Sequence, residues 1–145
     1  MTPGRTKDKS EIIEIQIPAK PQFLKIIRAA VGSICEISGG NLDDSHNVIL
    51  AVDEACSNII KHTYGGPTEE PIHATILISP EKIEIRLRDF GEKIDIKKIK
   101  PRKLDEIRPG GLGVHFINTV MDEVEYDNHF EQGNQVKLVK YIEKK

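Results

Sequence analysis

Three polar side chains recur at four-residue spacing near the middle of the chain: Glu54, Asn58 and His62. Residues four apart lie along one side of an α-helix, so the three are expected to form a stripe on one flank. A carboxylate can take a proton from an attacking hydroxyl or orient a water, and a carboxamide oxygen can ligate a hard cation such as Mg²⁺. A solvated helix face explains the same stripe, because surface helices are polar on their outer side.

A second chemical candidate is Asp89-Phe90-Gly91, within the stretch "RDFGEKID". It has the spelling of the eukaryotic-type protein kinases, but the Gly-rich strand turn, strand lysine and HRD-type loop of those enzymes do not precede it. Asp89 ends an alternating segment, and a carboxylate at a strand end can accept a hydrogen bond from an adenine amino group. Gly91 has no Cβ and lets the backbone approach a flat base. An ordinary turn after a strand remains the alternative.

The third candidate is a glycine-rich helix start made of Gly110, Gly111, Leu112 and Gly113. Its backbone N–H groups would form an anion site, yet it is neither a Rossmann fingerprint nor a Walker A loop. The preceding residues 97–108 hold six basic and two acidic side chains, which suits a mobile lid over a triphosphate. A solvated charged loop is the alternative. Arg108, nearest the glycines, is the candidate phosphate contact.

The elements that must position these residues follow from periodicity. Strands are predicted over 11–18, 71–79, 82–89, 123–128 and 134–143, and helices over 20–40, 45–64 and 113–122. Asp43 or Asp44 is the expected cap of the second helix, whose Val48, Val52, Ala55 and Ile59 should pack on the sheet. This order predicts an α/β (α+β) two-layer sandwich with helices on one face of a mostly antiparallel mixed sheet.

Composition narrows the class of protein. With 145 residues, 38% hydrophobic and 30% charged, the chain suits one folded domain over 11–145 after a flexible arm over 1–10. A net charge of −2 creates no basic field for nucleic acid. No apolar run could span a bilayer and no signal peptide is present, so a cytoplasmic location is expected. Cys35 and Cys56 are interpreted as reduced thiols.

The three blocks, in this order, resemble the N, G1 and G2 boxes of the GHKL superfamily of ATPases. The stretches "LAVDEACSNIIKHTY" and "RPGGLGVHFINTVMDEVEY" are similar to the bacterial anti-sigma-factor serine/threonine kinases. The resemblance covers about residues 11–141 and implies a Bergerat-type ATP-binding fold that uses ATP or ADP and Mg²⁺.

The resemblance also implies a role for each matching residue. Glu54 would be the catalytic base, Asn58 the Mg²⁺ ligand and Asp89 the acceptor for the adenine amino group. The remaining nucleotide-binding positions would be His62, Gly91, Arg108, Gly110, Gly111, Leu112 and Gly113. The chain departs from the broader G1 pattern at Lys93, where a second glycine is usual, and this favours the anti-sigma kinase branch over histidine kinases.

The activity implied is that of an anti-sigma factor with serine kinase activity. Such a protein sequesters a sigma factor, phosphorylates a serine on a STAS-fold anti-anti-sigma partner, forms a homodimer, and contacts neither nucleic acid nor membrane directly. The alternative is a non-catalytic nucleotide-binding interaction module. A histidine kinase is disfavoured because there is no room for a phosphoacceptor helix pair. A metal enzyme is disfavoured because the five histidines show no ligand spacing.

Overall fold

The alternating segments form a five-stranded sheet in the computed structural model, which describes residues 10–39, 42–99 and 111–142. The strands are β1 (Glu11–Ala19), β2 (Thr68–Ile78), β3 (Lys82–Asp89), β4 (Glu123–Asp127) and β5 (Asn134–Tyr141). Their order across the sheet is β1-β2-β3-β5-β4, and every pairing is antiparallel. The expectation of a mostly antiparallel sheet is confirmed, and no parallel pair occurs among the described residues. Two α-helices stand between β1 and β2, and one α-helix and one strand stand between β3 and β5. In both cases the chain reverses direction three times, so the neighbouring strands are antiparallel.

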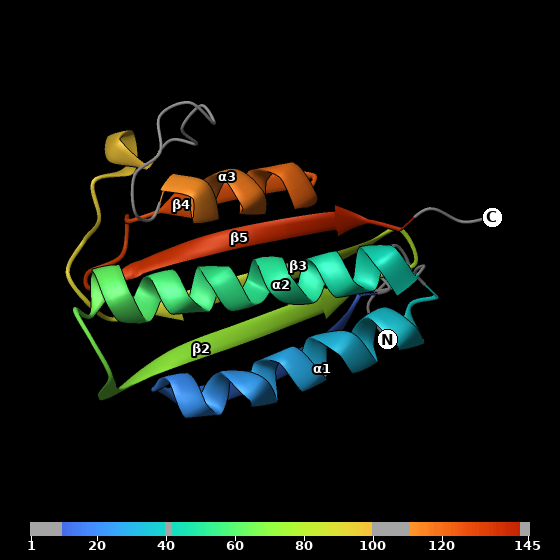
Figure 1. The fold of residues 1–145 in the computed structure, drawn as a ribbon, viewed down its shortest axis with the longest axis horizontal. Coiled ribbons are helices and arrows are strands. Elements are labelled where there is room, and N and C mark those ends of the chain that lie inside the picture. The colour runs from blue at the N-terminus through green and yellow to red at the C-terminus, as the bar shows by residue number, and fades with distance from the viewer. Residues whose placement is uncertain (1–9, 40–41, 100–110, 143–145) are drawn as a thin grey trace, which may run out of the picture.

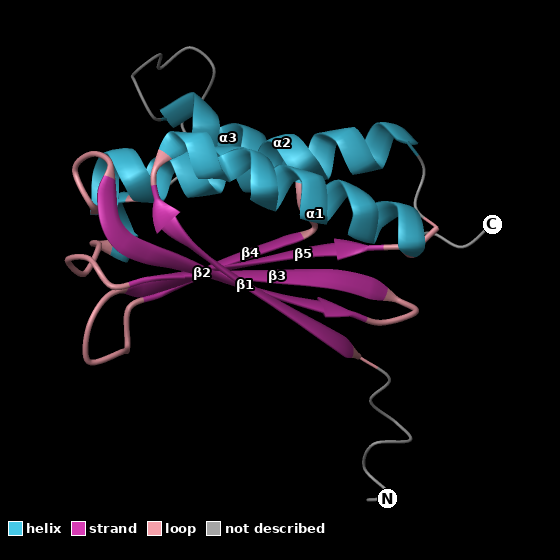
Figure 2. Ribbon diagram, turned by 90° about the horizontal axis from the view of Figure 1, so that it is seen from below, coloured by secondary structure: helices cyan, strands magenta, loops and turns pink. Residues whose placement is uncertain are grey.

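The helices form one layer on one side of this sheet (Figure 2). They are α1 (Leu24–Ile37), after the 3₁₀ turn Pro21–Phe23, α2 (Leu42–Asn58), and α3 (Gly111–Val120), with a second 3₁₀ turn over Ile96–Lys98. The α2 helix lies between α1 and α3 (Figure 1). It continues as a π-helical turn, η3 (Ile59–Thr63), rather than as α-helix to residue 64.

The predicted cap of the second helix is wrong. Helix α2 begins at Leu42, so Asp43 and Asp44 lie inside its first turn rather than before it. Acidic residues are also favourable there, because the first turn carries the positive end of the helix dipole. The sequence therefore predicted the helix but placed both its start and its cap too late.

An aliphatic core joins the two layers. On the helix side, Val48, Val52, Ala55 and Ile59 are buried, which confirms the predicted face of the second helix. On the sheet side, Ile85 pairs with Leu138 and Leu87 with Val136, all of them buried. The next pair along the same face is Asp89 with Asn134. The apolar ladder between β3 and β5 thus ends in two buried polar side chains.

The opposite face of the sheet carries charged side chains. Glu84 of β3 accepts a hydrogen bond from Arg86 at 2.6 Å, and Lys137 Nζ of β5 lies 3.1 Å from Glu125 Oε2 of β4.

Both cysteines are free thiols, as expected, and burial raises the pKa of the Cys56 thiol to about 12. None of the helices in the described part of the chain has the length and apolar character needed to cross a membrane.

Candidate functional site

The rotation of α2 about its axis is set by contacts on both of its flanks. On the α1 side, Asp53 accepts a hydrogen bond from Arg28 at 2.7 Å. On the α3 side, Glu54 faces Gly113. Since successive residues on a helix point about 100° apart, the two acidic neighbours serve different interfaces. Glu54, the first residue of the predicted stripe, therefore faces another helix, whereas His62, the last, is exposed.

The first and third sequence blocks meet at Glu54 and Gly113. A Cβ added to Gly113 would lie 2.8 Å from the Glu54 carboxyl carbon, closer than real Cβ atoms come to other heavy atoms. A side chain at residue 113 would therefore displace the Glu54 carboxylate from its position beside the first turn of α3. A carboxylate is placed beside a helix N-terminus, where backbone N–H groups favour negatively charged groups such as phosphate.

Glu54 and Asn58 are half-buried and lie one α-helical turn apart on the same flank. Neither side chain makes a hydrogen bond to another residue in the described ranges. A carboxamide oxygen with spare acceptor capacity suits Mg²⁺, which takes few protein ligands and completes its octahedral shell with waters and substrate phosphates. The residues present thus fit a Mg–nucleotide complex, with Asn58 as the protein ligand.

The end of α2 reaches the second sequence block through Tyr64. Its hydroxyl accepts a hydrogen bond from the Phe90 N–H at 2.8 Å and donates one to the Pro71 carbonyl at 2.7 Å. The π-helical turn places this ring, because the Tyr64 N–H bonds back to Ile59 rather than to residue 60. Sequence reasoning missed Tyr64; its position directly before the pair Gly65-Gly66, both with positive φ, was the available signal.

Asp89 is a buried carboxylate, with 2% of the residue exposed. Its Oδ1 accepts hydrogen bonds from the Gly91 N–H at 3.1 Å and from Asn134 Nδ2 at 3.0 Å. Burial raises the pKa of Asp89 above its ordinary value, and the donors from Asn134 and Gly91 offset part of that shift. A carboxylate can accept about four hydrogen bonds, so acceptor capacity remains for a ligand.

The loop after β3 is fixed by the β4–β5 connection. A Cβ on Gly133, whose φ is +82°, would lie 2.7 Å from the Asp89 carbonyl carbon. The Arg88 guanidinium stacks on the rings of Phe90 and Phe130, at 4.5 and 3.9 Å from their centroids. It also donates to the Gln132 carbonyl at 2.9 Å. The backbone around Asp89 is therefore set by residues some forty positions later in the chain.

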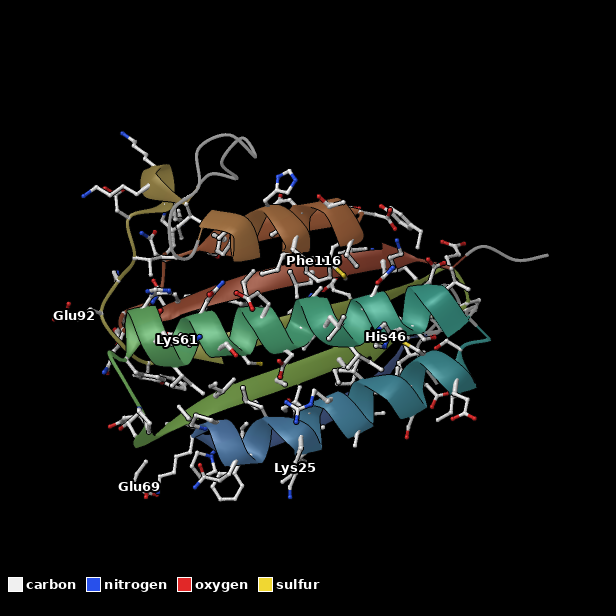
Figure 3. The ribbon with its side chains drawn as sticks, viewed as in Figure 1. Lys25, His46, Lys61, Glu69, Glu92 and Phe116 are labelled. Atoms are coloured by element: carbon white, nitrogen blue, oxygen red, sulfur yellow. The ribbon has the colours of Figure 1, made fainter. Side chains whose placement is uncertain are left out.

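Gly91 is needed by the protein's own packing as well as by any ligand. A Cβ there would lie 2.7 Å from Thr63 Cγ2 and 3.2 Å from the Tyr64 ring. The G1-like loop thus lies directly against η3. Figure 3 shows Lys61 on η3 and Glu92 of this loop at the same end of the molecule.

Lys93, the departure from the family pattern, is accommodated without strain. No non-glycine residue in the described ranges has a positive φ, so a glycine is not required at this position. The flanking main chain is held by Asn134, which bonds Glu92 and Ile94, and by Asn128, which donates to the Ile94 carbonyl at 3.0 Å.

The other predicted site residues make none of these contacts or lie outside the described residues. His62 lies in η3 and is exposed. Gly111 and Leu112 begin α3, whereas Arg108 and Gly110 lie outside the described residues, as does most of the predicted lid over 97–108. The structure therefore brings Glu54 and Gly113 together, with Asn58 one turn beyond Glu54 at the end of α2, and it places Asp89 and Gly91 beside η3.

Comparison with known proteins gives matches over nearly the whole chain. Residues 17–140 match the family described as the histidine kinase-like ATPase domain. The chain is 32% identical over 141 residues to the serine-protein kinase RsbW of Listeria monocytogenes serotype 4a (strain HCC23), covering 92% of this chain and 88% of that protein. It is 27% identical over 144 residues to the serine-protein kinase RsbW of Bacillus subtilis (strain 168), covering 94% and 89%.

Solved structures share the fold. A chain from the SiaB–SiaC complex of Pseudomonas aeruginosa superposes with a TM-score of 0.64 at 14% identity, covering 96% of this chain and 94% of that one. The structure of the RsbU and RsbW domains of a Mycobacterium tuberculosis protein gives a TM-score of 0.63, also at 14% identity, covering 91% and 32%. At this level of identity the likeness concerns the arrangement of helices and strands.

The burial of Asp89 predicts a stability effect. Asp89→Asn keeps an oxygen to accept from Gly91 and Asn134 but removes a buried charge, so it should raise the melting temperature by on the order of a few degrees at pH 8. The gain should shrink as the pH falls through the raised pKa of Asp89, because the wild-type carboxyl then also becomes neutral. Differential scanning calorimetry from pH 4 to 8 measures this, with Glu92→Gln, an exposed carboxylate of the same loop, as control. A lower melting temperature for Asp89→Asn at pH 8 would contradict the account.

Proposed function

The chain belongs to the family of histidine kinase-like ATPase domains, in the branch of the RsbW serine-protein kinases, and we propose on this basis that it is an ATP-dependent protein serine kinase. The observation that carries the proposal is the close approach of Gly113, in the first turn of α3, to Glu54, with Asn58 one turn further along the same flank of α2. That flank combines a free carboxylate, a free carboxamide and a helix N-terminus, which are the groups that phosphoryl transfer from a Mg–nucleotide requires.

Each group has a separate task in the proposed reaction. Asp89 accepts a hydrogen bond from the adenine amino group and holds the nucleobase at the end of α2. Asn58 would ligate Mg²⁺, which, when bound, neutralises charge on the phosphates. The N–H groups at the start of α3 bind the phosphates.

The transfer itself needs a base. Glu54 takes the proton from the serine hydroxyl as the serine oxygen bonds to the γ-phosphorus of ATP. The bond between the γ-phosphorus and the oxygen that bridges the β- and γ-phosphates breaks, and ADP is released. Because the chemistry is largely a matter of position and charge, the fixed rotation of α2 matters more than the reactivity of any one side chain.

The protein substrate is proposed to be a serine of a STAS-fold anti-anti-sigma protein, and the second partner a sigma factor held inactive by a homodimer of this chain. Similarity to the RsbW serine-protein kinases supports this assignment. Phosphorylation would end competition between the two partners. A non-catalytic nucleotide-binding module is the competing function, and the phosphotransfer test below separates the two.

The base role of Glu54 predicts a selective loss of transfer. With Mg-ATP and the cognate STAS protein, Glu54→Gln should slow phosphoserine formation by about 10² to 10⁴-fold, the usual contribution of a general base, and leave ADP affinity within a few-fold of wild type. Glu36→Gln is the control, because it removes the charge of an exposed carboxylate on another helix, α1, and leaves the contact between Arg28 and Asp53 intact. Phosphoserine is measured by mass spectrometry. Equal rates for wild type and Glu54→Gln would refute the base assignment, and no transfer by wild type would favour the binding module.

The contact between α3 and Glu54 predicts an effect of one methyl group. Gly113→Ala improves helix propensity by about 1 kcal/mol yet displaces the Glu54 carboxylate, so the melting temperature should hold while transfer falls by at least about tenfold. Asn118→Ala, at an exposed position of the same helix, should transfer normally. Full activity of Gly113→Ala would show that Glu54 need not occupy this position.

If Asp89 binds the adenine nucleobase rather than Mg²⁺, the variant Asp89→Asn should lose nucleotide affinity whether or not Mg²⁺ is present. Asp89→Asn should weaken ATP and ADP binding by at least about tenfold, and by the same factor in Mg²⁺ and in EDTA, because a donor would then face the amino group of adenine. Isothermal titration calorimetry gives both affinities. A loss confined to the Mg²⁺-dependent part of binding would place Asp89 at the metal instead.

A further inference from the structure

The hydroxyl of Tyr64 occupies a place in the sheet that a main-chain hydrogen bond would otherwise take. At this end of the β2–β3 ladder the last pair is His73 with Arg88, so the same register two residues further on sets Pro71 opposite Phe90. In an antiparallel ladder the N–H of one such residue can bond directly to the carbonyl of the other. Here the Phe90 N–H donates to the Tyr64 hydroxyl at 2.8 Å, and that hydroxyl donates to the Pro71 carbonyl at 2.7 Å. A side chain from the end of the α2–η3 helix is thus inserted between two strands.

A tyrosine suits this place because its hydroxyl can donate and accept at the same time. Burial raises the pKa of Tyr64 above its ordinary value, so the group keeps the proton that it donates to Pro71. The π-helical turn directs the ring, since the Tyr64 N–H bonds to the Ile59 carbonyl at 2.9 Å, and single π-turns within helices are frequent at functional sites. One hydroxyl therefore joins the end of the helix, the start of β2 and the loop after β3.

The loop after β3 is also held on its other side, by the β4–β5 connection. Gln132 Nε2 donates to the Phe90 carbonyl at 2.8 Å, and the Arg88 guanidinium stacks on the Phe90 ring at 4.5 Å from its centroid. Loss of the Tyr64 hydroxyl would leave these contacts in place. It would instead release the end of the helix whose middle carries Glu54.

The ring of Tyr64 and its hydroxyl have separable roles. The ring packs against Gly91, where an added Cβ would lie 3.2 Å from ring atom Cδ1. Tyr64→Phe keeps this packing and removes the hydroxyl alone. The Phe90 N–H and the Pro71 carbonyl, which lie at opposed positions, could then bond to each other directly, so that neither need remain unsatisfied. The fold should therefore persist in this variant, with the helix no longer joined to the two strands.

We propose that Tyr64 is a positioning residue for phosphoryl transfer: by bonding to Phe90 and Pro71 it fixes where α2 lies along its own axis, and so sets Glu54 relative to a nucleotide held by the loop after β3. This inference rests on the proposed kinase function and adds to it a residue that acts through a helix rather than on the reacting atoms. The effect can be large, because a misplacement of about 1 Å at the reacting atoms can slow a reaction by about 10²-fold.

The test measures transfer and nucleotide affinity separately. Tyr64→Phe should slow phosphoserine formation at saturating Mg-ATP by at least about tenfold, while the affinities for ADP and ATP stay within about threefold of wild type. Mass spectrometry with the cognate STAS protein gives the rates and isothermal titration calorimetry the affinities, both well below the melting temperature of each variant. Tyr141→Phe is the matched control, because it removes a tyrosine hydroxyl bonded to Glu123 at the far end of β5. It should leave both quantities unchanged.

A double-mutant cycle separates positioning from a general loss of structure. If Tyr64 acts by placing Glu54, then Tyr64→Phe should slow transfer by less than about threefold in a Glu54→Gln background, because no base remains to be placed. A purely structural role would give the same factor in both backgrounds.

The outcomes separate this inference from the function beneath it. Equal factors in the two backgrounds, or a nucleotide affinity that falls as much as the transfer rate, would reduce Tyr64 to a structural contact and overturn the proposal. Wild-type transfer rates in Tyr64→Phe would overturn it too. In these cases the wild-type protein still transfers phosphate and the proposed function stands. Wild-type protein that transfers no phosphate would instead refute the proposed function, and this inference with it.

Discussion

A single buried charge constrains much of this molecule. Asp89 ends the apolar ladder between β3 and β5 and lies on the core side of the sheet, where an unpaired carboxylate would cost several kcal/mol. The surrounding chain offsets that cost. Gly91 and Asn134 donate to it, and Gly133 leaves room for its main chain. A buried carboxylate is less favourable to folding than an aliphatic side chain at this position, and its presence supports the assignment of Asp89 to the proposed nucleotide site.

Helix α2 connects this charge to the other chemical groups. Its middle presents Glu54 to α3, and its end, through η3, presents Tyr64 to the loop after Asp89. From Glu54 to Thr63 the helix advances roughly 13 Å at 1.5 Å per residue. One rigid element therefore sets the distance between Asp89, proposed to bind the nucleobase, and the groups at Glu54 and Gly113 that are proposed to act at the phosphates. Its rotation is fixed on the opposite flank by the ion pair of Asp53 with Arg28.

The two acidic side chains of the site differ in their surroundings, and this suits different tasks. Asp89 is enclosed and held by donors, so the position of its carboxyl group is set before any ligand arrives. Glu54 is half-buried at the boundary of two helices, with no hydrogen bond to another described residue, and is open to a reacting group. Lys93 fits the turn after Gly91 because the backbone there has no positive φ, so the turn does not require glycine. Hydrogen bonds from Asn128 and Asn134 to the main chain of Ile94 hold this conformation.

Much of the fold and the main site residues could be predicted from the sequence. Periods of two and of about 3.6 residues located all five strands and the three α-helices, since each element must bury one side, and the order of the blocks around Glu54, Asp89 and Gly113 indicated the family. The cap of α2 and the end of that helix were wrong or incomplete, because acidic residues suit several positions of a first turn and a π-helical turn has no composition of its own. Tyr64, Gly133 and Asn134 were missed altogether. Their roles arise from hydrogen bonds and close approaches between segments up to 45 positions apart, and only the register of β3 with β5 and the packing of η3 on the loop bring those segments together.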